Sequence, residues 1–382
     1  MRTSLWTGPG AVAVVALLAL GGCGAQNGDG PEGQDATGAT ADRTVDPAAG
    51  RAQAVVDRAT EMAVEEFVPP GPPVAGVDDL EGGTVHYVPA SSKVGTFLAV
   101  RDGMAQALGH AGVTVETCDG TGDPVVMAAC VTAAVEADVD VIVTGAVPED
   151  RIATALVHAS RAEIPVLFTQ TAPTGRGYPA EVGYLSPDHA EQQGWLAEWV
   201  VADSGGTGSV LVVQLIDTPA MQAWVQDGAL PVYAACPGCT TSLLEVTTGR
   251  LGELPALVEE ALARSPATRY VHVTMDVAVD AAVQGIEATG RTDVLVVSQD
   301  GTPEVLEQVT PDGPVGAVAG FDHTAMGWYA ADQVLRLMTG GESVREVDFP
   351  YSRLITAENA SEGYGDMSYE EGFLQLWGLD ED

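Results

Sequence analysis

Residues 139–168 read VDVIVTGAVPEDRIATALVHASRAEIPVLF. Two short apolar runs, Val139–Val143 and Pro165–Phe168, flank a longer alanine-rich stretch, Glu149–Ala162. Strands buried on both faces have nearly continuous apolar runs of this kind, whereas a longer run with its apolar residues on one side is typical of a helix. A strand, a helix and a second strand in this order predict a parallel pair with a right-handed crossover.

The same alternation continues along the chain from Thr84 to Met338, which predicts an α/β fold with parallel sheets. A first set ends near Tyr184 and a second begins with a helix at Pro187, so we expect two doubly wound lobes. The expected strands are 84–88, 113–117, 139–143, 165–168, 182–184, 209–214, 240–246, 270–274, 294–297 and 315–319. The expected helices are 96–110, 124–136, 149–162, 187–203, 219–230, 254–264, 276–289, 303–309 and 325–338.

The N-terminal segment has the features of an export signal. Arg2 precedes an apolar run, Ala11–Leu20, which is too short to span a bilayer and fits the hydrophobic region of a signal peptide. The run leads into Gly21-Gly22-Cys23, which resembles a bacterial lipobox. That resemblance implies that residues 1–22 are a signal peptide and that Cys23 is lipidated and becomes the mature N-terminus.

Residues 23–82 are expected to form a tether and a short helix. From Gly24 to about Gly50 the chain is rich in Gly, Asp, Ala and Thr and has no aromatic residue, a composition typical of a flexible spacer. A short helix is predicted over Arg51–Phe67, and the proline-rich run at 69–73 would end it. The folded body should begin near Gly83.

Four cysteines follow Cys23, an even number for a chain exported to an oxidising compartment. Proximity along the chain favours the disulfides Cys118–Cys130 and Cys236–Cys239. The second pair also has the C-x-x-C spacing of redox sites, but such sites follow a strand and open a helix. Here the motif precedes an expected strand, so we interpret it as a structural clip. No second Cys or His pair has zinc-ligand spacing, so no metal site is expected.

Composition argues against several functions. The chain has 54 acidic and 16 basic residues and a net charge of −38, whereas nucleic-acid binding relies on clustered Lys and Arg. The motifs G-x-S-x-G and H-E-x-x-H are absent, and the single lysine, Lys93, follows a serine and cannot end a phosphate loop. We therefore expect no enzymatic activity and no cofactor. The acidity is interpreted as a solvated surface, with a cationic ligand as the alternative.

Polar residues follow many of the expected strands, at the edge where ligands bind in open parallel sheets. Asp, Ser and Thr are also the favoured N-caps of helices, so each of these residues has a structural alternative. The polar residues that we select as candidate ligand contacts are Gln170, Asp217, Asp276 and Asp300.

Several stretches recur in an ordered series between Thr84 and Ala357. They are Gly95-Thr96-Phe97 running into Arg101-Asp102-Gly103, then DVDVIVT at 138–144, IPVLF at 164–168, VTMD at 273–276, VVSQDGTP at 296–303, and the segment from Gly327 to Gly340. Their order and spacing resemble the type I periplasmic binding proteins, in the ribose-binding-like sugar branch. The resemblance implies two lobes joined by three crossovers. The N-terminal lobe would comprise 84–186 and 321–344, and the C-terminal lobe and tail 187–320 and 345–382.

The same resemblance implies a function. The lobes would close around a ligand, and separately encoded ABC permease and ATPase subunits would be the partners. We therefore expect an extracytoplasmic, monomeric substrate-binding lipoprotein of an ABC importer, anchored to the outer face of the cell membrane and binding a small polar ligand such as a sugar. Two alternatives remain open, namely a ligand-sensing receptor for a signalling partner and a binding protein for a cationic solute.

The ligand residues of the family are only partly matched. Asp300 matches, but Gln170-Thr171 stands where ribose-type members have Asp-Arg, and Met275-Asp276 where they have Asn-Asp. Sugars are bound by polar side chains together with a stacked aromatic ring. Phe97, where the family has an aromatic pair, and Trp224, in a helix where the family supplies an Arg, are the candidate rings. Phe97 could equally belong to the helix core.

Overall fold

The computed structural model describes residues 46–61, 67–171, 173, 182–340, 346–364 and 368–379. The predicted signal peptide, Cys23 and the tether as far as Val45 lie outside the described residues. Among the described residues, no helix is long and apolar enough to cross a membrane.

The first sheet has six strands in the order β11-β5-β4-β3-β1-β2, and all of its pairs are parallel. Its interior strand β3 is buried along its whole length, as its apolar sequence predicts, whereas the edge strand β2 (TVET) is largely exposed. The strands are β1 (Thr84–Pro89), β2 (Thr114–Thr117), β3 (Val141–Gly145), β4 (Val166–Thr169), β5 (Val182–Ser186) and β11 (Glu346–Asp348). The helices connected to them are α2 (Gly95–Gly109), α3 (Pro124–Glu136), α4 (Ala153–Arg161) and α11 (His323–Met338).

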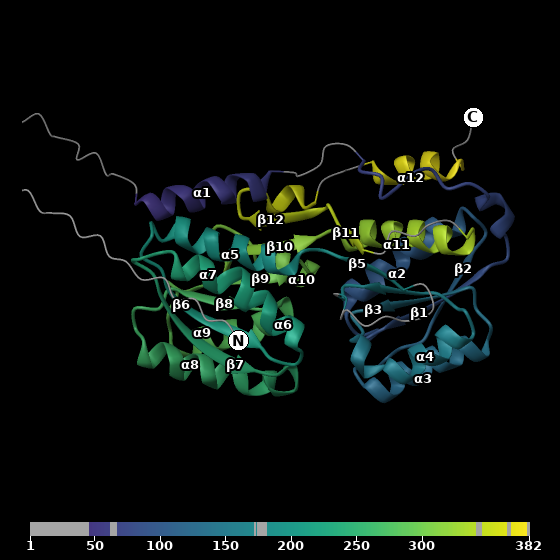
Figure 1. Ribbon diagram of the computed structural model, residues 1–382. Coiled ribbons are helices and arrows are strands. Elements are labelled where there is room, and N and C mark those ends of the chain that lie inside the picture. The colour runs from purple at the N-terminus through teal and green to yellow at the C-terminus, as the bar shows by residue number, and fades with distance from the viewer. Residues whose placement is uncertain are drawn as a thin grey trace, which may run out of the picture. The chain divides into compact units, whose positions relative to one another are not determined.

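The second sheet has the order β12-β10-β9-β8-β6-β7, and only β12 runs antiparallel to its neighbour. Its strands are β6 (Ser209–Leu215), β7 (Thr240–Val246), β8 (Tyr270–Val273), β9 (Leu295–Asp300), β10 (Val315–Phe321) and β12 (Ser352–Thr356). Its helices are α5 (His189–Asp203), α6 (Pro219–Ala223), α7 (Leu230–Ala234), α8 (Leu254–Arg264), α9 (Val279–Ala288) and α10 (Pro303–Leu306). The predicted α/β fold with two parallel-sheet lobes is confirmed (Figure 1).

One predicted helix, 219–230, is interrupted in the structure. A π-helical turn, Trp224–Ala229, separates α6 from α7. The N–H of Leu230 donates to the carbonyl of Val225, five residues back, and Pro231 follows, which has no N–H to continue an α-helical ladder. The wider turn lies at Trp224, one of the candidate ligand residues.

The two ends of the described chain pack on different sheets. Helix α1 (Pro47–Thr60) begins at Asp46, whose side chain accepts from the N–H of Ala48, and packs against α5 and β12 (Figure 1). Helix α12 (Tyr369–Trp377) packs against α11. The predicted division placed all of 345–382 with the second lobe. In the structure β11 pairs with β5 of the first sheet, β12 pairs with β10 of the second, and α12 joins the core of the first.

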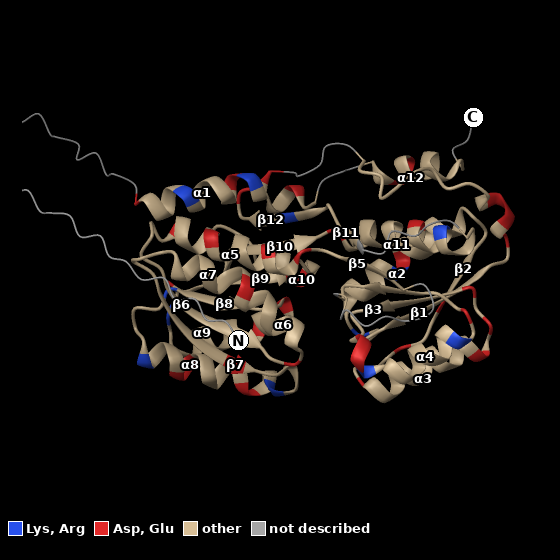
Figure 2. Cartoon of the chain, in the orientation of Figure 1, with Lys and Arg blue, Asp and Glu red and all other residues tan. Residues whose placement is uncertain are grey.

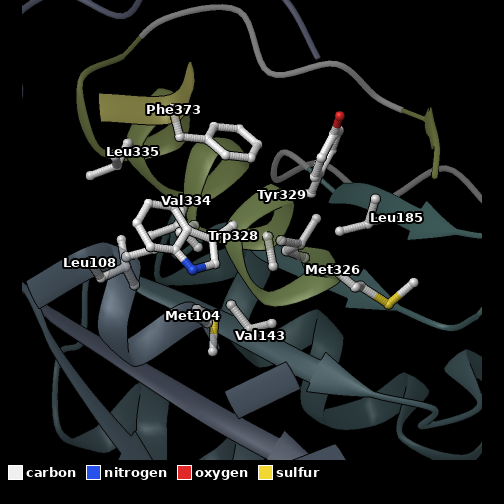
Figure 3. Close-up of a cluster of buried hydrophobic side chains, with 14 of the residues drawn as sticks. Met104, Leu108, Val143, Leu185, Met326, Trp328, Tyr329, Val334, Leu335 and Phe373 are labelled. Carbon is white, nitrogen blue, oxygen red and sulfur yellow. The ribbon is translucent and has the colours of Figure 1, made fainter. Parts of the chain in front are cut away.

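An aromatic core explains where α12 packs. Trp328 of α11 is fully buried and stacks on Trp377 with ring centroids 5.8 Å apart, and Phe373 is also fully buried. Figure 3 shows Trp328 between Met104 and Leu108 of α2 and Phe373 of α12. Burying rings of this size contributes several kcal/mol each, so the amphipathic tail is held to the first lobe by hydrophobic burial.

Both disulfides join the cysteines that are close in sequence. Cys118, directly after β2, is bonded to Cys130 in α3, and Cys236 is bonded to Cys239 just before β7. The first bond ties an edge strand of the first sheet to the helix that follows it. Charged residues are spread over the surface: Figure 2 shows Asp and Glu on helices and loops of both sheets, with few Lys or Arg between them.

Candidate functional site

Three neighbouring strands of the second sheet end in carboxylates. Asp276 follows β8, Asp300 ends β9, and Asp322 follows β10. Because β8, β9 and β10 are adjacent and parallel, these side chains share one edge of the sheet. The negative charge of Asp276 acts on Asp300, and all three carboxylates act on the hydroxyl of Tyr364.

Asp276 is bound within the protein. It is buried and accepts hydrogen bonds from the hydroxyl of Ser298 at 2.6 Å, and from the N–H and hydroxyl of Thr302 at 2.7 and 2.9 Å. Burial raises the pKa of its carboxyl, and these hydrogen bonds act against that rise. Asp276 therefore fixes the loop between β9 and α10, a structural role that is the alternative to ligand contact.

Asp300 makes fewer hydrogen bonds within the protein than Asp276, and the one that acts on its carboxyl comes from the backbone of Asp276. Asp300 is partly exposed, and its backbone has a φ of 124°, a conformation that is rare for any residue other than glycine. Burial and the nearby charge of Asp276 raise the pKa of Asp300 well above its usual value. Backbone strain and a perturbed carboxyl at one position are typical of functional sites.

Trp224 lies against a histidine that the sequence did not single out. The rings of Trp224 and His189 are 4.1 Å apart at 31°. His189 begins α5, immediately after the crossover from β5, and is 7% exposed. Its ring also lies edge-on to Phe321, at the end of β10, with centroids 6.3 Å apart. Trp224 is itself partly exposed, and the contact of His189 with Phe321 places this aromatic group near the end of β10.

A chain of buried hydrogen bonds holds His189 in place. Gln299, next to Asp300, contacts Nδ1 of His189, and Gln193 donates to Gln299 at 2.8 Å. Oε1 of Gln193 in turn accepts from Nε2 of His272 at 2.9 Å, and Nδ1 of His272 pairs with the hydroxyl of Tyr233 at 2.8 Å. A fully buried network of this kind fixes the relative positions of α5, β8 and β9.

The buried histidines predict acid sensitivity. Burial lowers the pKa of His189 to about 4 and that of His272 to about 3, so folding favours the neutral rings. Above about pH 6.5 the rings are neutral in both the folded and the unfolded protein. Below that pH the unfolded chain takes up protons first, so the free energy of unfolding falls by about 1.4 kcal/mol per pH unit for each histidine. The raised carboxyl pKa values of Asp276 and Asp300 act in the opposite sense, with stability lost as pH rises.

A single variant separates these effects. Between pH 6.5 and 5 we expect the free energy of unfolding to fall by about 2 kcal/mol less in His272→Gln than in the wild type, whatever the variant's stability at pH 7. Urea unfolding at both pH values measures this difference. An unchanged pH dependence in the variant would show that His272 does not titrate as its burial predicts.

The remaining candidates lie in both lobes. Phe97, in α2, is partly exposed, and its carbonyl accepts from the hydroxyl of Tyr87 at 3.1 Å. Gln170 follows β4 with a φ of 57°, and its Oε1 is buried without a hydrogen-bond partner among the described residues. Asp217 accepts from the N–H and hydroxyl of Thr248, so it ties the loop after β6 to the loop after β7.

The structure thus collects Asp276, Asp300 and Trp224 at strand or helix ends of the second lobe and Phe97 and Gln170 at those of the first. Sequence reasoning missed His189 and Tyr364. The sequence does place His189 at the start of a helix that follows a strand. No motif of fixed spacing links this histidine to a second residue, however, so it was not selected. Within the part of the chain that the structure describes, no group of three or more His, Cys, Asp or Glu could hold a metal ion.

Three solved structures have the same fold. An ABC sugar transporter subunit from Rhodobacter sphaeroides 2.4.1 is 24% identical, with a TM-score of 0.64, covering 73% of this chain and 100% of that one. A solute-binding protein from Agrobacterium vitis with bound allitol is 22% identical (TM-score 0.64; 74% and 98% covered). A solute-binding protein from Burkholderia graminis in complex with D-arabinose is 18% identical (TM-score 0.67; 75% and 99% covered). At these identities the likeness shows the fold.

No curated protein matches the sequence. A family model described as a periplasmic binding protein domain, however, matches residues 85–342, which is more than half of the chain. The match spans both sheets, from β1 to the end of α11. The chain therefore belongs to the periplasmic binding protein family, whose members are binding proteins and not enzymes.

Proposed function

We propose that this protein is the substrate-binding component of an ABC importer and that it binds a small polar ligand, a sugar or polyol, between its two lobes. The observation that carries the ligand class is a set of buried side-chain atoms without a hydrogen-bond partner among the described residues. Three atoms of this set, Thr144 Oγ1, Gln170 Oε1 and Gln214 Oε1, lie at the carboxyl ends of β3, β4 and β6.

Unpaired buried polar atoms are costly, at about 1–3 kcal/mol each. In this family's fold they lie where parallel strands end, the edge at which ligands bind. A ligand rich in hydroxyl groups would satisfy them from both lobes at once, since Gln170 belongs to the first lobe and Gln214 to the second. Asp300 would accept from a further hydroxyl, and Trp224 would stack on the apolar face of a sugar ring.

Binding would act through closure of the lobes. Contacts made by one ligand to both lobes favour the closed arrangement by the difference in affinity between the closed and open states. A membrane permease with its ATPase would then recognise the closed form. We further propose that the protein works outside the cytoplasm, held to the membrane by a lipid on Cys23, because the sequence before Cys23 resembles a lipoprotein signal.

A thermal-shift screen of the purified protein tests the proposal. The panel holds D-allose, allitol, D-tagatose, D-arabinose, myo-inositol and glycerol, the ligands bound in similar folds, together with pentoses, hexoses and disaccharides. A ligand present at 100 times its Kd stabilises the fold by about 2.7 kcal/mol, which raises the Tm by several degrees. We expect at least one sugar or polyol to do so. A folded sample that responds to none of them contradicts the proposal.

A cationic solute is the second candidate. None of Asp276, Asp300 and Asp322 takes part in a salt bridge among the described residues. Carboxylates gathered without a counter-ion attract a positive charge, which a ligand amine would provide. Amino sugars and simple amines therefore belong in the same panel. A shift from amines but not from sugars would replace the sugar proposal with this one.

A further inference from the structure

Tyr364 reaches the carboxylate edge from outside the matched family region. It follows the short helix η6 (Ala360–Glu362), well beyond residue 342 where the family match ends. Its hydroxyl lies 3.5 Å from the carbonyl of Gly301, directly after β9. A Cβ on Gly301, or on Gly320 in β10, would collide with that hydroxyl, so both positions require glycine. The tyrosine therefore occupies space left open at the ends of two central strands.

The turn that carries Tyr364 is anchored by segments from both ends of the chain. Arg353 of β12 is 6% exposed and donates to the carbonyl of Gly363 at 2.7 Å, to Glu362 at 2.7 Å and to the carbonyl of Thr60, the last residue of α1, at 2.8 Å. Asn359 also donates to the Thr60 carbonyl, at 3.2 Å. These hydrogen bonds hold the backbone next to Tyr364 in place. Helix α1 and strand β12 therefore together determine the position of the Tyr364 side chain.

The electrostatic surroundings keep the Tyr364 hydroxyl protonated. Burial, and then the charges of Asp276, Asp322 and Asp300, raise the pKa of the Tyr364 hydroxyl well above its usual value. The hydroxyl is therefore a hydrogen-bond donor throughout the pH range in which the protein is folded. Its hydrogen bond goes to the carbonyl of Gly301, next to Asp300, and as a polar group beside the carboxylates it lessens the cost of their ionised form.

We propose that Tyr364 is a positioning residue of the ligand site, which holds the end of β9 and the carboxylate of Asp300 in the arrangement that the ligand recognises. The segments before and after the family domain, α1 and the turn after β12, are thereby part of the binding site's construction. The inference rests on the proposed function and adds to it a determinant of affinity that lies in the C-terminal extension.

The test is Tyr364→Phe, which keeps the ring and removes the hydroxyl. The probe is the panel sugar or polyol that gives the largest thermal shift with the wild type, and its Kd is measured by titration calorimetry between pH 4.5 and 8. We expect the Kd at pH 7 to rise roughly tenfold. The matched control is Tyr270→Phe, because the Tyr270 hydroxyl donates to Asp203 at 2.6 Å at the opposite end of the same sheet. We expect its Kd to stay within twofold of the wild type.

A pH profile separates positioning of Asp300 from a merely structural role. The titratable groups that face Tyr364 are Asp276, Asp300 and Asp322, and on its own turn Glu362 is paired with Arg353. The hydroxyl is a polar group beside buried carboxylates, so its loss leaves them in less polar surroundings; their pKa values rise and the acid midpoint of binding moves to higher pH. Tyr270→Phe should leave the midpoint unchanged.

The outcomes are distinct. Weaker binding by Tyr364→Phe, with the midpoint moved upward, supports the inference. Unchanged Kd and midpoint, with the wild type binding the probe, overturn it while the proposed function stands. Weaker binding by Tyr364→Phe with an unchanged acid midpoint of binding would show that the hydroxyl does not position Asp300, and would overturn the inference. If no panel member binds the wild type, the proposed function and this inference fall together.

Discussion

Asp300→Asn is expected to weaken ligand binding about a hundredfold while leaving the unliganded fold at least as stable as the wild type. A hydrogen bond to a charged group is worth about 1.5–3 kcal/mol, and the amide offers one acceptor where the carboxylate offers two. Stability should hold because burial and the charge of Asp276 disfavour the ionised Asp300 in the empty site. Removing that charge relieves an unfavourable interaction.

Two measurements check this expectation, the Tm without ligand and the Tm shift with the panel sugar that binds best. Asp276→Asn is the matched control, since it removes the neighbouring charge. Asp276 accepts three hydrogen bonds from Ser298 and Thr302, so its replacement should lower the Tm of the empty protein. If Asp300→Asn binds the sugar as tightly as the wild type, Asp300 is not a ligand residue.

The architecture of both sheets could be predicted from the sequence because strands buried on both faces need apolar residues throughout. The run at 141–143 and the run at 210–213 are buried at every position. The edge strand β7 was also predicted, although most of it is exposed, because it is rich in β-branched and apolar residues. Element boundaries were less accurate. Strand β9 continues three residues beyond the predicted Val297 and so includes Asp300 itself.

The carboxylate edge of the candidate site could be predicted only where it follows from strand order. Asp276 and Asp300 were predicted to lie together because the carboxyl ends of parallel strands meet at one edge, and the structure places them there. Tyr364 could not be found this way, because it follows no strand of the alternating pattern and arrives through a turn fixed by Arg353. Nor does sequence show which of these carboxylates is tied to a neighbouring loop. Asp217 and Asp276 have the same local pattern as Asp300, yet both are bound to neighbouring loops.

The position of the tail was likewise outside the reach of sequence periodicity. Sequence periodicity does not show on which sheet helix α12 packs. That choice depends on Trp328, whose indole stacks on Trp377, and on a buried ion pair one turn further along α11.

That ion pair gives the largest stability effect that we expect. Asp332 is fully buried and accepts from Arg336 at 2.7 and 3.1 Å, and from the indole N–H of Trp377 at 3.0 Å. Arg336, 4% exposed, also donates to the carbonyl of Pro72 at 2.7 Å. The pair therefore connects α11 with α12 and with the segment that precedes β1.

Asp332→Ala should lower the free energy of unfolding by about 3–5 kcal/mol, because it leaves a guanidinium buried without a counter-ion and an indole N–H without an acceptor. The double variant Asp332→Leu with Arg336→Met should recover most of that loss, since two apolar side chains of similar volume avoid the desolvation of both charges. Urea unfolding of the three proteins distinguishes the cost of an unpaired charge from the loss of packing. If the double variant is no more stable than Asp332→Ala, the pair itself, and not merely its charge balance, holds α12 on the first lobe.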